Sequence, residues 1–239
     1  MKEYKLPRLL YDYDKLEPYV DAKTMETHHT KHHNNYVNGL NSTLAGINSG
    51  KSLGELVENL MKAKDGYSAD VFKNLTLCAG GHFNHTLYFR IMTPNLKTED
   101  SMDESLRLLI EQKFGSISGL KDAFTEKTKK VVGSGWIFLV LPLKEMNVFY
   151  EEETLVLTNE ETTIKETLKA GELAVIATKN QESPSMYFEQ LVPIIAMDIW
   201  EHAYYLKHTS DKVSYVNEWF KTLDWEFIGE IYRQTHLGE

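Results

Sequence analysis

The first part of the chain carries the hydrophobic pattern of amphipathic helices. Along residues 25–40, apolar and histidine side chains recur at steps of three and four residues, which places them on one stripe of a long helix. Ser52 and Glu55 form a capping-box pattern that predicts the start of a second helix. A third helix is predicted over residues 71–92. We therefore expect an N-terminal helical domain, built on a long helical hairpin, over residues 1–95.

The pattern changes after the polar, turn-rich segment 93–103. Short runs rich in β-branched residues predict strands, with helices before and after them. The expected helices cover residues 104–114, 118–130, 212–221 and 225–233, and the expected strands cover residues 136–141, 172–178 and 191–197. The predicted fold class is therefore α+β, in which the helical hairpin domain is followed by a C-terminal α+β domain, residues 96–239, with a small antiparallel sheet.

The connection between the first two predicted strands, residues 141–172, has patterned content of its own. Residues 147–150 and 154–158 are typical of strands, and residues 158–161 form a capping-box pattern that predicts a short helix ending near Gly171. Three Lys and eight Glu lie between residues 144 and 172, so this acidic extension contributes −5 to the net charge of −9. We favour an extended surface hairpin. The alternative is a contact with another subunit or a basic partner.

Composition and charge exclude several classes of protein. Of 239 residues, 42% are hydrophobic and 26% are charged, as in ordinary globular chains, and no apolar run is long enough to span a membrane. A net charge of −9 argues against nucleic acid as a partner, because phosphate binding needs a basic face. A single cysteine, Cys78, cannot form an internal disulfide. The N-terminus lacks a secretory signal, so we expect the cytoplasm, or the mitochondrial matrix if a leader was removed.

The candidate chemistry lies in nine unevenly distributed histidines. Neutral imidazole and carboxylate are the usual ligands of first-row transition metals. Two histidine pairs have helical spacing and can each face one site: His28 with His32, and His82 with His85. Asp198 ends an apolar strand, and His202 follows through a turn. Packing or a solvated surface explains any one of these segments more easily than a site does, but the three together favour a mononuclear histidine–carboxylate centre.

Longer motifs resemble those of the iron/manganese superoxide dismutase family. They span most of the chain in that family's order: Leu6-Pro, Tyr11-Asp-Tyr13, Leu16-Glu-Pro18, His28-His-Thr-Lys-His32-His-Asn-Asn-Tyr36-Val-Asn, Gly80-Gly-His-Phe-Asn-His85, Gly133-Ser-Gly-Trp136 and Asp198-Ile-Trp-Glu-His-Ala-Tyr-Tyr205-Leu. The resemblance implies an enzyme that converts two superoxide ions to dioxygen and hydrogen peroxide. One manganese or iron ion per subunit would cycle between its trivalent and divalent states.

The resemblance also implies a role for individual residues. The implied metal ligands are His28, His85, Asp198 and His202, with a solvent molecule as the fifth ligand. Tyr36 and His32 resemble the pair at the mouth of the active-site funnel, and Tyr36 would hydrogen-bond toward the metal-bound solvent through Gln181. Trp136 and Trp200 resemble aromatic walls of the site.

Further implied roles lie at the surface. Glu201 and Tyr205 resemble residues that cross the interface of a homodimer to reach histidines of the partner's site, so we expect a homodimer or a dimer of dimers. Lys31 and Lys212 occupy positions where the family tends to carry basic residues near the funnel. There they would offset the acidic surface and attract the superoxide anion, although two solvated surface lysines explain them equally well.

The choice of metal depends on where the glutamine comes from. Gln181 together with Gly81 resembles the manganese-type arrangement, because iron-preferring relatives supply the glutamine from the helix, at the position of Gly81. A donor near the coordinated solvent changes its acidity and thereby the potential of the metal. Manganese is the expected cofactor, with iron or both as alternatives. The sequence departs from the family at Phe89 and Phe138, where we expect tryptophan, and in the length of the acidic extension.

Two other functions compete with superoxide dismutation. One is a metal-binding structural relative without turnover, which the presence of all the implied ligands argues against. The other is a different metal-dependent oxygen reaction, since histidine–carboxylate sites with open positions also serve iron oxygenases. Those sites usually contain two histidines and one carboxylate, whereas the implied set has three histidines.

Overall fold

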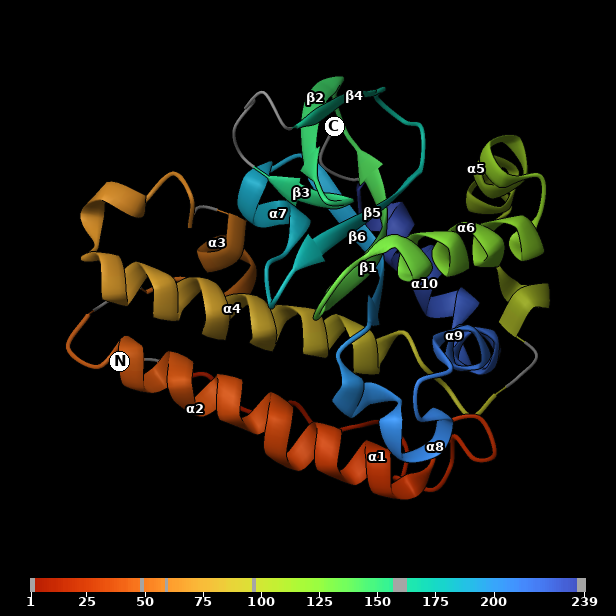
Figure 1. Ribbon diagram of the computed structural model, residues 1–239, viewed down its shortest axis with the longest axis horizontal. Helices are drawn as coiled ribbons and strands as arrows, with labels where there is room; N and C mark the ends of the chain where they lie inside the picture. Colours follow the sequence, from red (N-terminus) through yellow and green to blue (C-terminus); the bar gives the residue numbers. More distant parts are fainter. Residues whose placement is uncertain (1–2, 48–49, 59, 96–97, 157–162, 236–239) are drawn as a thin grey trace.

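A long helix crosses the N-terminal part of the protein (Figure 1), and its winding changes in the middle. The computed structural model describes residues 3–47, 50–58, 60–95, 98–156 and 163–235. The helix consists of α1 (Ala22–Thr27), the π-helical turn η1 (His28–His33) and α2 (Asn34–Thr43). The carboxylate of Asp21 caps its start by accepting a hydrogen bond from the Thr24 N–H. π-Helical turns are rare and occur mostly at functional sites, and this one holds four histidines.

Helix α4 (Ala69–Arg90) lies alongside this first helix and completes the hairpin (Figure 1). Between them stand the short helix α3 (Leu53–Glu58) and the 3₁₀ turn η2 (Lys64–Gly66). The predicted capping box is confirmed: Glu55 N–H donates to Ser52 Oγ at 3.3 Å, and Ser52 N–H donates to Glu55 Oε2 at 2.7 Å. The three helices enclose a small apolar core of their own.

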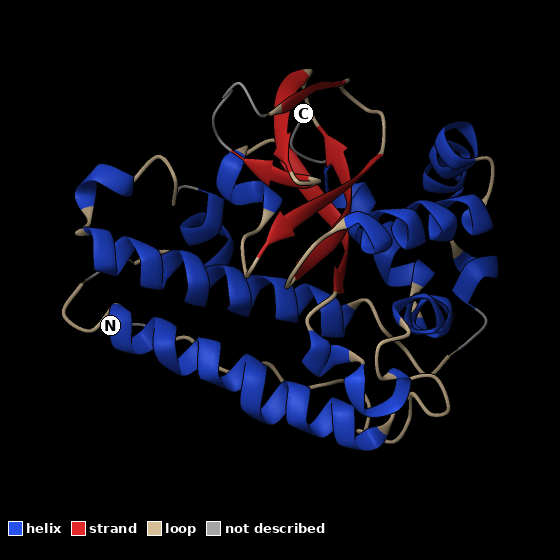
Figure 2. Cartoon of the chain, viewed as in Figure 1, coloured by secondary structure: helices blue, strands red, loops and turns tan. Residues whose placement is uncertain are grey.

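The C-terminal part is built around a three-stranded antiparallel sheet (Figure 2). Its strands, in the order β5-β1-β6, are β1 (Gly135–Pro142), β5 (Ala174–Lys179) and β6 (Leu191–Asp198). Trp136 is paired with Thr178 on one side and with Asp198 on the other, so this register brings an indole beside the last residue of β6. The three predicted strands and the α+β fold class are confirmed.

Helices surround this sheet. They are α5 (Glu104–Phe114), α6 (Ile117–Lys130), α7 (Pro184–Tyr187), α8 (Tyr205–His208), α9 (Lys212–Trp219) and α10 (Trp225–Thr235), with the 3₁₀ turns η3 (Thr98–Ser101), η4 (Glu201–Ala203) and η5 (Phe220–Thr222). The four helices predicted from the pattern are all present. The exact boundary between the two domains stays a prediction.

The acidic extension forms a second three-stranded sheet, and here the sequence prediction was partly wrong. Strands β2 (Met146–Glu151) and β3 (Thr154–Val156) agree with the expected hairpin. The expected helix ending near Gly171 is instead strand β4 (Ile164–Leu168), which pairs with β2. Pairing with β2 overrides the local helix signal. The capping-box residues 158–161 lie outside the described residues.

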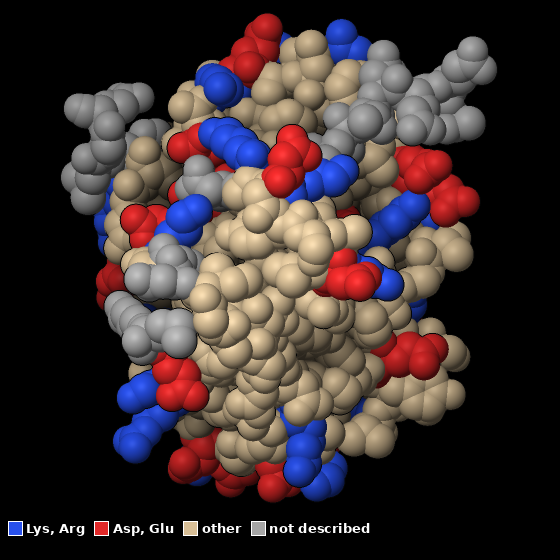
Figure 3. Space-filling model, turned by 90° about the vertical axis from the view of Figure 1, so that its left-hand side faces the viewer, with Lys and Arg blue, Asp and Glu red and all other residues tan. Residues whose placement is uncertain are grey.

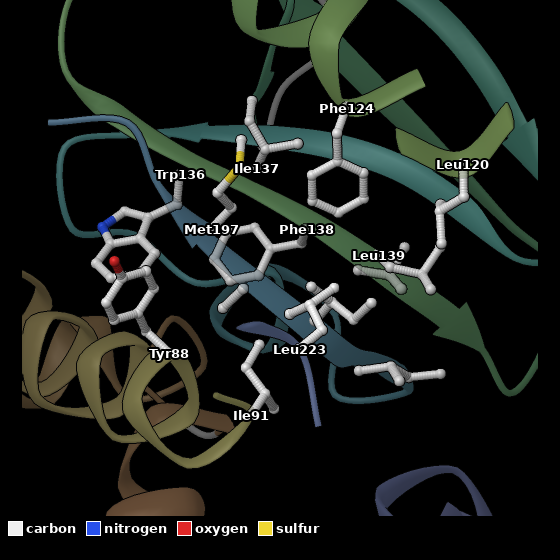
Figure 4. Packing of buried hydrophobic residues seen from close by; sticks show 14 of the residues in the cluster. Tyr88, Ile91, Leu120, Phe124, Trp136, Ile137, Phe138, Leu139, Met197 and Leu223 are labelled. Atoms are coloured by element: carbon white, nitrogen blue, oxygen red, sulfur yellow. The ribbon is translucent and has the colours of Figure 1, made fainter. Parts of the chain in front are cut away.

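The main core joins the end of α4 to the sheet and to α6. Figure 4 shows its centre, where side chains from helix and sheet interdigitate: Tyr88, Ile91, Leu120, Phe124, Trp136, Phe138 and Met197. All of these are 2% exposed or less, and each such side chain contributes about 2 kcal/mol through burial. This core fixes α4 against β1 and β6, and therefore fixes the side chains that these elements carry at their ends.

Candidate metal centre

Four elements bring four potential ligands together. His28 lies in η1, His85 in α4, Asp198 at the end of β6 and His202 in η4. One ligand atom from each side chain lies within 4.8 Å of all the others. His28, His85 and Asp198 are fully buried, and the His202 side chain is 14% exposed. Among the described residues, this is the one group of three or more His, Cys, Asp or Glu with metal-binding geometry.

Asp198 is the centre of the cluster, because its Oδ2 faces all three imidazoles. The Nε2 atoms of His28 and His202 each lie 3.1 Å from Oδ2, and Nε2 of His85 lies 3.7 Å away. Two bonds hold Asp198 in this orientation. Its Oδ1 accepts a hydrogen bond from the Trp200 N–H at 2.8 Å, and its backbone carbonyl accepts one from the Tyr215 hydroxyl at 2.9 Å.

The tautomer of His85 is fixed by the helix that carries it. Its Nδ1–H donates to the Gly81 carbonyl at 2.6 Å, which leaves the lone pair on Nε2. That Nε2 is buried and has no hydrogen-bond partner within normal distance. A buried acceptor without a donor is costly, so the environment favours a cation at this position.

The protonation states of the cluster suit a metal cation. Burial lowers the pKa of His28 to about 4 and lowers that of His85 well below its usual value, so both imidazoles are neutral at pH 7. Burial alone would raise the pKa of Asp198, but its electrostatic interaction with His202 and the hydrogen bonds from His202 and His28 hold it well below its usual range. An anionic carboxylate among nitrogen donors, without a thiolate, fits manganese or iron.

Gln181 and Tyr36 lie next to the cluster. Gln181 is fully buried, and its Oε1 accepts a hydrogen bond from Trp136 Nε1–H at 3.0 Å. Its Nε2 is also buried and has no partner within hydrogen-bond distance. The Tyr36 ring is 5.2 Å from that of His85. Burial and the Asp198 charge raise the pKa of Tyr36 to about 12, while the Gln181 side chain acts in the opposite direction, so the phenol keeps its proton at neutral pH.

Position 81 has no room for a side chain. A Cβ on Gly81 would lie 2.5 Å from Cγ of the Tyr36 ring. Any side chain at this position would therefore displace Tyr36. Gln181 lies in the segment after β5, and the Tyr36 ring fills the space beside Gly81.

Aromatic rings form the walls of the cluster. His32 is half-buried and stacks on His202, with ring centres 3.9 Å apart. Trp136 packs edge-on against His85 at 5.0 Å, and Trp200 stacks on His202 at 5.8 Å. Phe89, where we expect tryptophan, contacts His28 at 5.1 Å, so the wall is aromatic despite the substitution.

Comparison with known proteins identifies this arrangement. The sequence profile for iron/manganese superoxide dismutases, alpha-hairpin domain, matches residues 3–93, and that for the C-terminal domain of the same enzymes matches residues 102–167 and 161–231. Proteins named superoxide dismutase 2, with the metals given as Mn/Fe, from Staphylococcus aureus strains Mu50, N315 and MW2 are each 33% identical to this chain over 231 residues. The matched region is 96% of this chain and 98% of each relative. The chain belongs to the iron/manganese superoxide dismutase family.

This protein is thus a superoxide dismutase, and manganese or iron is its cofactor. Superoxide is its substrate. The alternatives of a non-catalytic relative and of an iron oxygenase are set aside, because the family and the set of three histidines with one carboxylate agree. No helix among the described residues is long and apolar enough to cross a membrane.

The spacing of His82 and His85 permits both to face one site, but the cluster of potential ligands contains only His85. His82 faces away from the cluster, and its Nδ1 lies 2.8 Å from Nε2 of His33. Burial is the main reason that the pKa of His33 falls to about 2 and that of His82 to about 4. The difference follows from the packing of α4, which places His85 beside Asp198 of β6 and His82 beside His33 of η1.

This buried pair predicts that the protein loses stability in mild acid. In the unfolded chain His33 and His82 take up protons near pH 6.5, whereas in the folded protein they resist protonation until the pH is near 4 or lower. The unfolded state therefore binds more protons between pH 6.5 and 4, and stability falls as the pH falls through that window. We expect the melting temperature to fall by roughly 5 °C or more across it. The variant His82→Gln should show a smaller fall by calorimetry, and an equal fall would contradict this explanation.

The surface residues singled out from the sequence are accessible. Tyr205 is 50% exposed, Glu201 and Lys31 are exposed, and Lys212 is partly exposed. The steering role of the two lysines stays a prediction. Figure 3 shows the face of the molecule that carries α3 and the start of α4. Acidic and basic side chains are interspersed around this face, and its centre consists of residues of other types.

The acidic extension is partly neutralised by its own chain. Glu153 forms an ion pair with Lys127 of α6 at 3.1 Å, and Glu151 forms one with Lys179 of β5 at 3.2 Å. These contacts tie the second sheet to the main body and account for part of its acidic charge without a partner. They favour the surface-hairpin interpretation.

Sequence reasoning missed several residues that organise the centre. They include Tyr215, which holds the Asp198 backbone, and Asn84, which lies within a motif that was recognised but was given no role. Asn84 could have been singled out from the sequence, because it directly precedes His85 in that motif. Tyr215 carries no such signal, because its contact depends on how α9 packs beneath the sheet.

Proposed function

We propose that His28, His85, Asp198 and His202 hold the catalytic metal ion of this superoxide dismutase, one ion per chain. The observation that carries the assignment is the convergence of four ligand atoms within 4.8 Å in a buried site. When bound, the ion would supply the one-electron couple that oxidises one superoxide to dioxygen and reduces the next to peroxide. The neutral imidazoles and the single carboxylate leave the ion a modest net positive charge, which suits a couple that must react in both directions.

The protein must also deliver protons, since hydrogen peroxide forms from the reduced superoxide and two protons. We assign this task to Tyr36, with His32 beside it at the mouth of the site. The raised pKa of Tyr36 keeps a proton on its hydroxyl at neutral pH. Gln181 supplies a buried amide donor that has no other partner within hydrogen-bond distance, so it is available to orient a small oxygen species. Trp136 and Trp200 exclude bulk water from the buried ligands.

We further propose that manganese is the working metal. The combination of Gln181 with a glycine at position 81 supports this choice, and the contact between position 81 and the Tyr36 ring explains why glycine stands there. Growth of cells expressing the protein in manganese or in iron, followed by metal analysis and superoxide consumption per bound ion, provides the test. We expect the manganese form to be at least about tenfold more active per ion. Higher activity for the iron form would contradict the assignment. If neither the manganese form nor the iron form consumes superoxide, the proposed metal centre itself is overturned.

A homodimer, or a dimer of such dimers, is proposed on the basis of the surface beside His202. Glu201 and Tyr205 are exposed next to the ligand, together with Leu206, which is 65% exposed. Exposed apolar and aromatic side chains beside a site are typical of a surface that is covered in an assembly. Sedimentation equilibrium should give at least twice the chain mass of 27.6 kDa, and Glu201→Arg should shift the mass toward the monomer. A monomeric unaltered protein at micromolar concentration would refute the proposal.

The compartment proposed is the cytoplasm, or the mitochondrial matrix if a leader was removed. The bacterial source of the relatives supports the first of these. Cell fractionation would test it, and recovery of the protein with the medium or the membrane fraction would contradict it.

A further inference from the structure

We propose that Asn84 is a positioning residue, which ties the backbone at Gln181 to helix α4 and so determines where the Gln181 amide lies. This inference rests on the role proposed above for Gln181. Asn84 precedes the ligand His85 on the same helix, yet its side-chain amide bonds to the segment that follows β5.

The contact is made by one amide group with two consecutive carbonyls. Asn84 is fully buried, and its Nδ2 donates to the carbonyl oxygens of Gln181 at 3.2 Å and of Glu182 at 3.1 Å. Two bonds from one NH₂ group fix the rotation of the segment as well as its distance from the helix. Because the group is buried, no water can replace these bonds if they are lost.

The helix approaches this segment with no space to spare. A Cβ on Gly80 would lie 2.0 Å from the Gln181 carbonyl oxygen, so only glycine allows the approach. Gly80 therefore permits the close contact, and Asn84, one helical turn later, holds it. The backbone of Gln181 is thus located by α4, the helix that also carries His85.

Backbone bonds hold both neighbours of Gln181: Asn180 N–H donates to the Ser134 carbonyl at 3.0 Å, and Glu182 N–H donates to the Lys179 carbonyl at 3.1 Å. The Gln181 carbonyl itself accepts from Asn84. Thr178 Oγ1 donates to the Glu182 carbonyl at 2.6 Å and so anchors the following residue to β5. Trp136 binds Oε1 of the Gln181 side chain, while Nε2 has no partner within hydrogen-bond distance. The position of Gln181 Nε2 therefore depends on the position of the Gln181 backbone. A shift of the backbone by a few tenths of an ångström would move Nε2 by a similar distance.

The test is a double-mutant cycle with the reduction potential of the manganese-loaded protein as its readout. The variants are Asn84→Leu, which keeps the volume and removes the donor, Gln181→Ala, and the double variant. We expect Gln181→Ala to shift the potential, and Asn84→Leu to shift it in the same direction by a smaller amount, with about tenfold loss of activity. The double variant should have the potential of Gln181→Ala alone. Thr222→Val, which removes a buried bond to the Trp219 carbonyl away from this segment, should lower the melting temperature but leave the potential unchanged.

The outcomes separate the two levels of the argument. An unchanged potential in Gln181→Ala would overturn the role of Gln181 and this inference with it. A shift in Gln181→Ala without one in Asn84→Leu would overturn the positioning role alone. Additive shifts in the double variant would also overturn it, because Asn84 would then act through His85. If Asn84→Leu does not fold, Asn84→Ser, which shortens the side chain without adding bulk, replaces it in the same cycle with the same expected and contradicting results.

Discussion

Replacing Asp198 with asparagine is expected to prevent metal binding and to lower superoxide consumption by more than about 100-fold. Asp198 is the single carboxylate of the four proposed ligands, and its Oδ2 lies 3.1 Å from two of the three imidazole nitrogens. The substitution keeps the shape of the side chain but removes its negative charge. Neutral histidines and a neutral amide cannot compensate the charge of a divalent or trivalent ion in a buried site. Metal analysis of the purified variant, together with its activity, gives the measurement.

The matched control for this variant is Asp211→Asn. Asp211 caps α9, where its carboxylate accepts a hydrogen bond from the Ser214 N–H at 3.0 Å. Asparagine keeps an oxygen that can accept this bond, so the substitution should cost little stability and should leave metal content and turnover unchanged. Full metal content in Asp198→Asn would contradict the ligand assignment. Equal losses of metal in both variants would indicate a general defect of folding.

Removal of the metal is expected to lower the melting temperature by about 10 °C. The metal binds the folded chain and not the unfolded one, so it stabilises the fold by about 4 kcal/mol when its free concentration is a thousand times the dissociation constant. For a chain of this length each kcal/mol corresponds to about 2–4 °C. Metal removal also leaves the buried Asp198 carboxylate without a cation to balance it.

Calorimetry of the metal-loaded and the chelator-treated protein measures this difference. Addition of manganese to the treated protein should restore the original melting temperature, whereas magnesium, which prefers an all-oxygen octahedral site, should not. The Asp198→Asn variant provides the internal control, because its melting temperature should respond to neither treatment. Identical melting temperatures for the loaded and treated wild-type protein would show that the ion is not bound within the folded core.

Local sequence determines much of this fold, and the elements that it determines are those with strong end signals. Helix α5 has the predicted bounds because Asp103 caps its start and Gly115, in a left-handed conformation, ends it. Strand β6 was recognised by its apolar content, and Asp198 was correctly expected at its end. Strand β4 was not recognised, because its conformation depends on pairing with β2 and not on its own residues.

The candidate site shows a similar limit. Spacing identifies the histidine pairs on the two long helices, but it does not separate His85 from His82, because residues three apart lie on the same face of a helix. The structure separates them through packing, which pairs His82 with His33. The family resemblance supplied the distinction that spacing could not. The π-helical turn at His28–His33 was not predicted, since one wider turn leaves no clear trace in the pattern of apolar positions.

The roles of Asn84 and Gly80 illustrate what sequence alone leaves out. Both lie in the recognised motif around His85, and both act on a segment about 100 residues further along the chain. A contact of this kind depends on two carbonyl oxygens whose positions no side-chain pattern encodes. It becomes visible only when helix α4 and the segment after β5 are seen together.

The most direct test of the account is anomalous X-ray scattering from a crystal of the manganese-loaded protein, measured on both sides of the manganese absorption edge. The account predicts a single strong peak per chain, surrounded by Nε2 of His28, His85 and His202 and Oδ2 of Asp198. A peak at another location, such as between His33 and His82, or no peak in active protein, would contradict it.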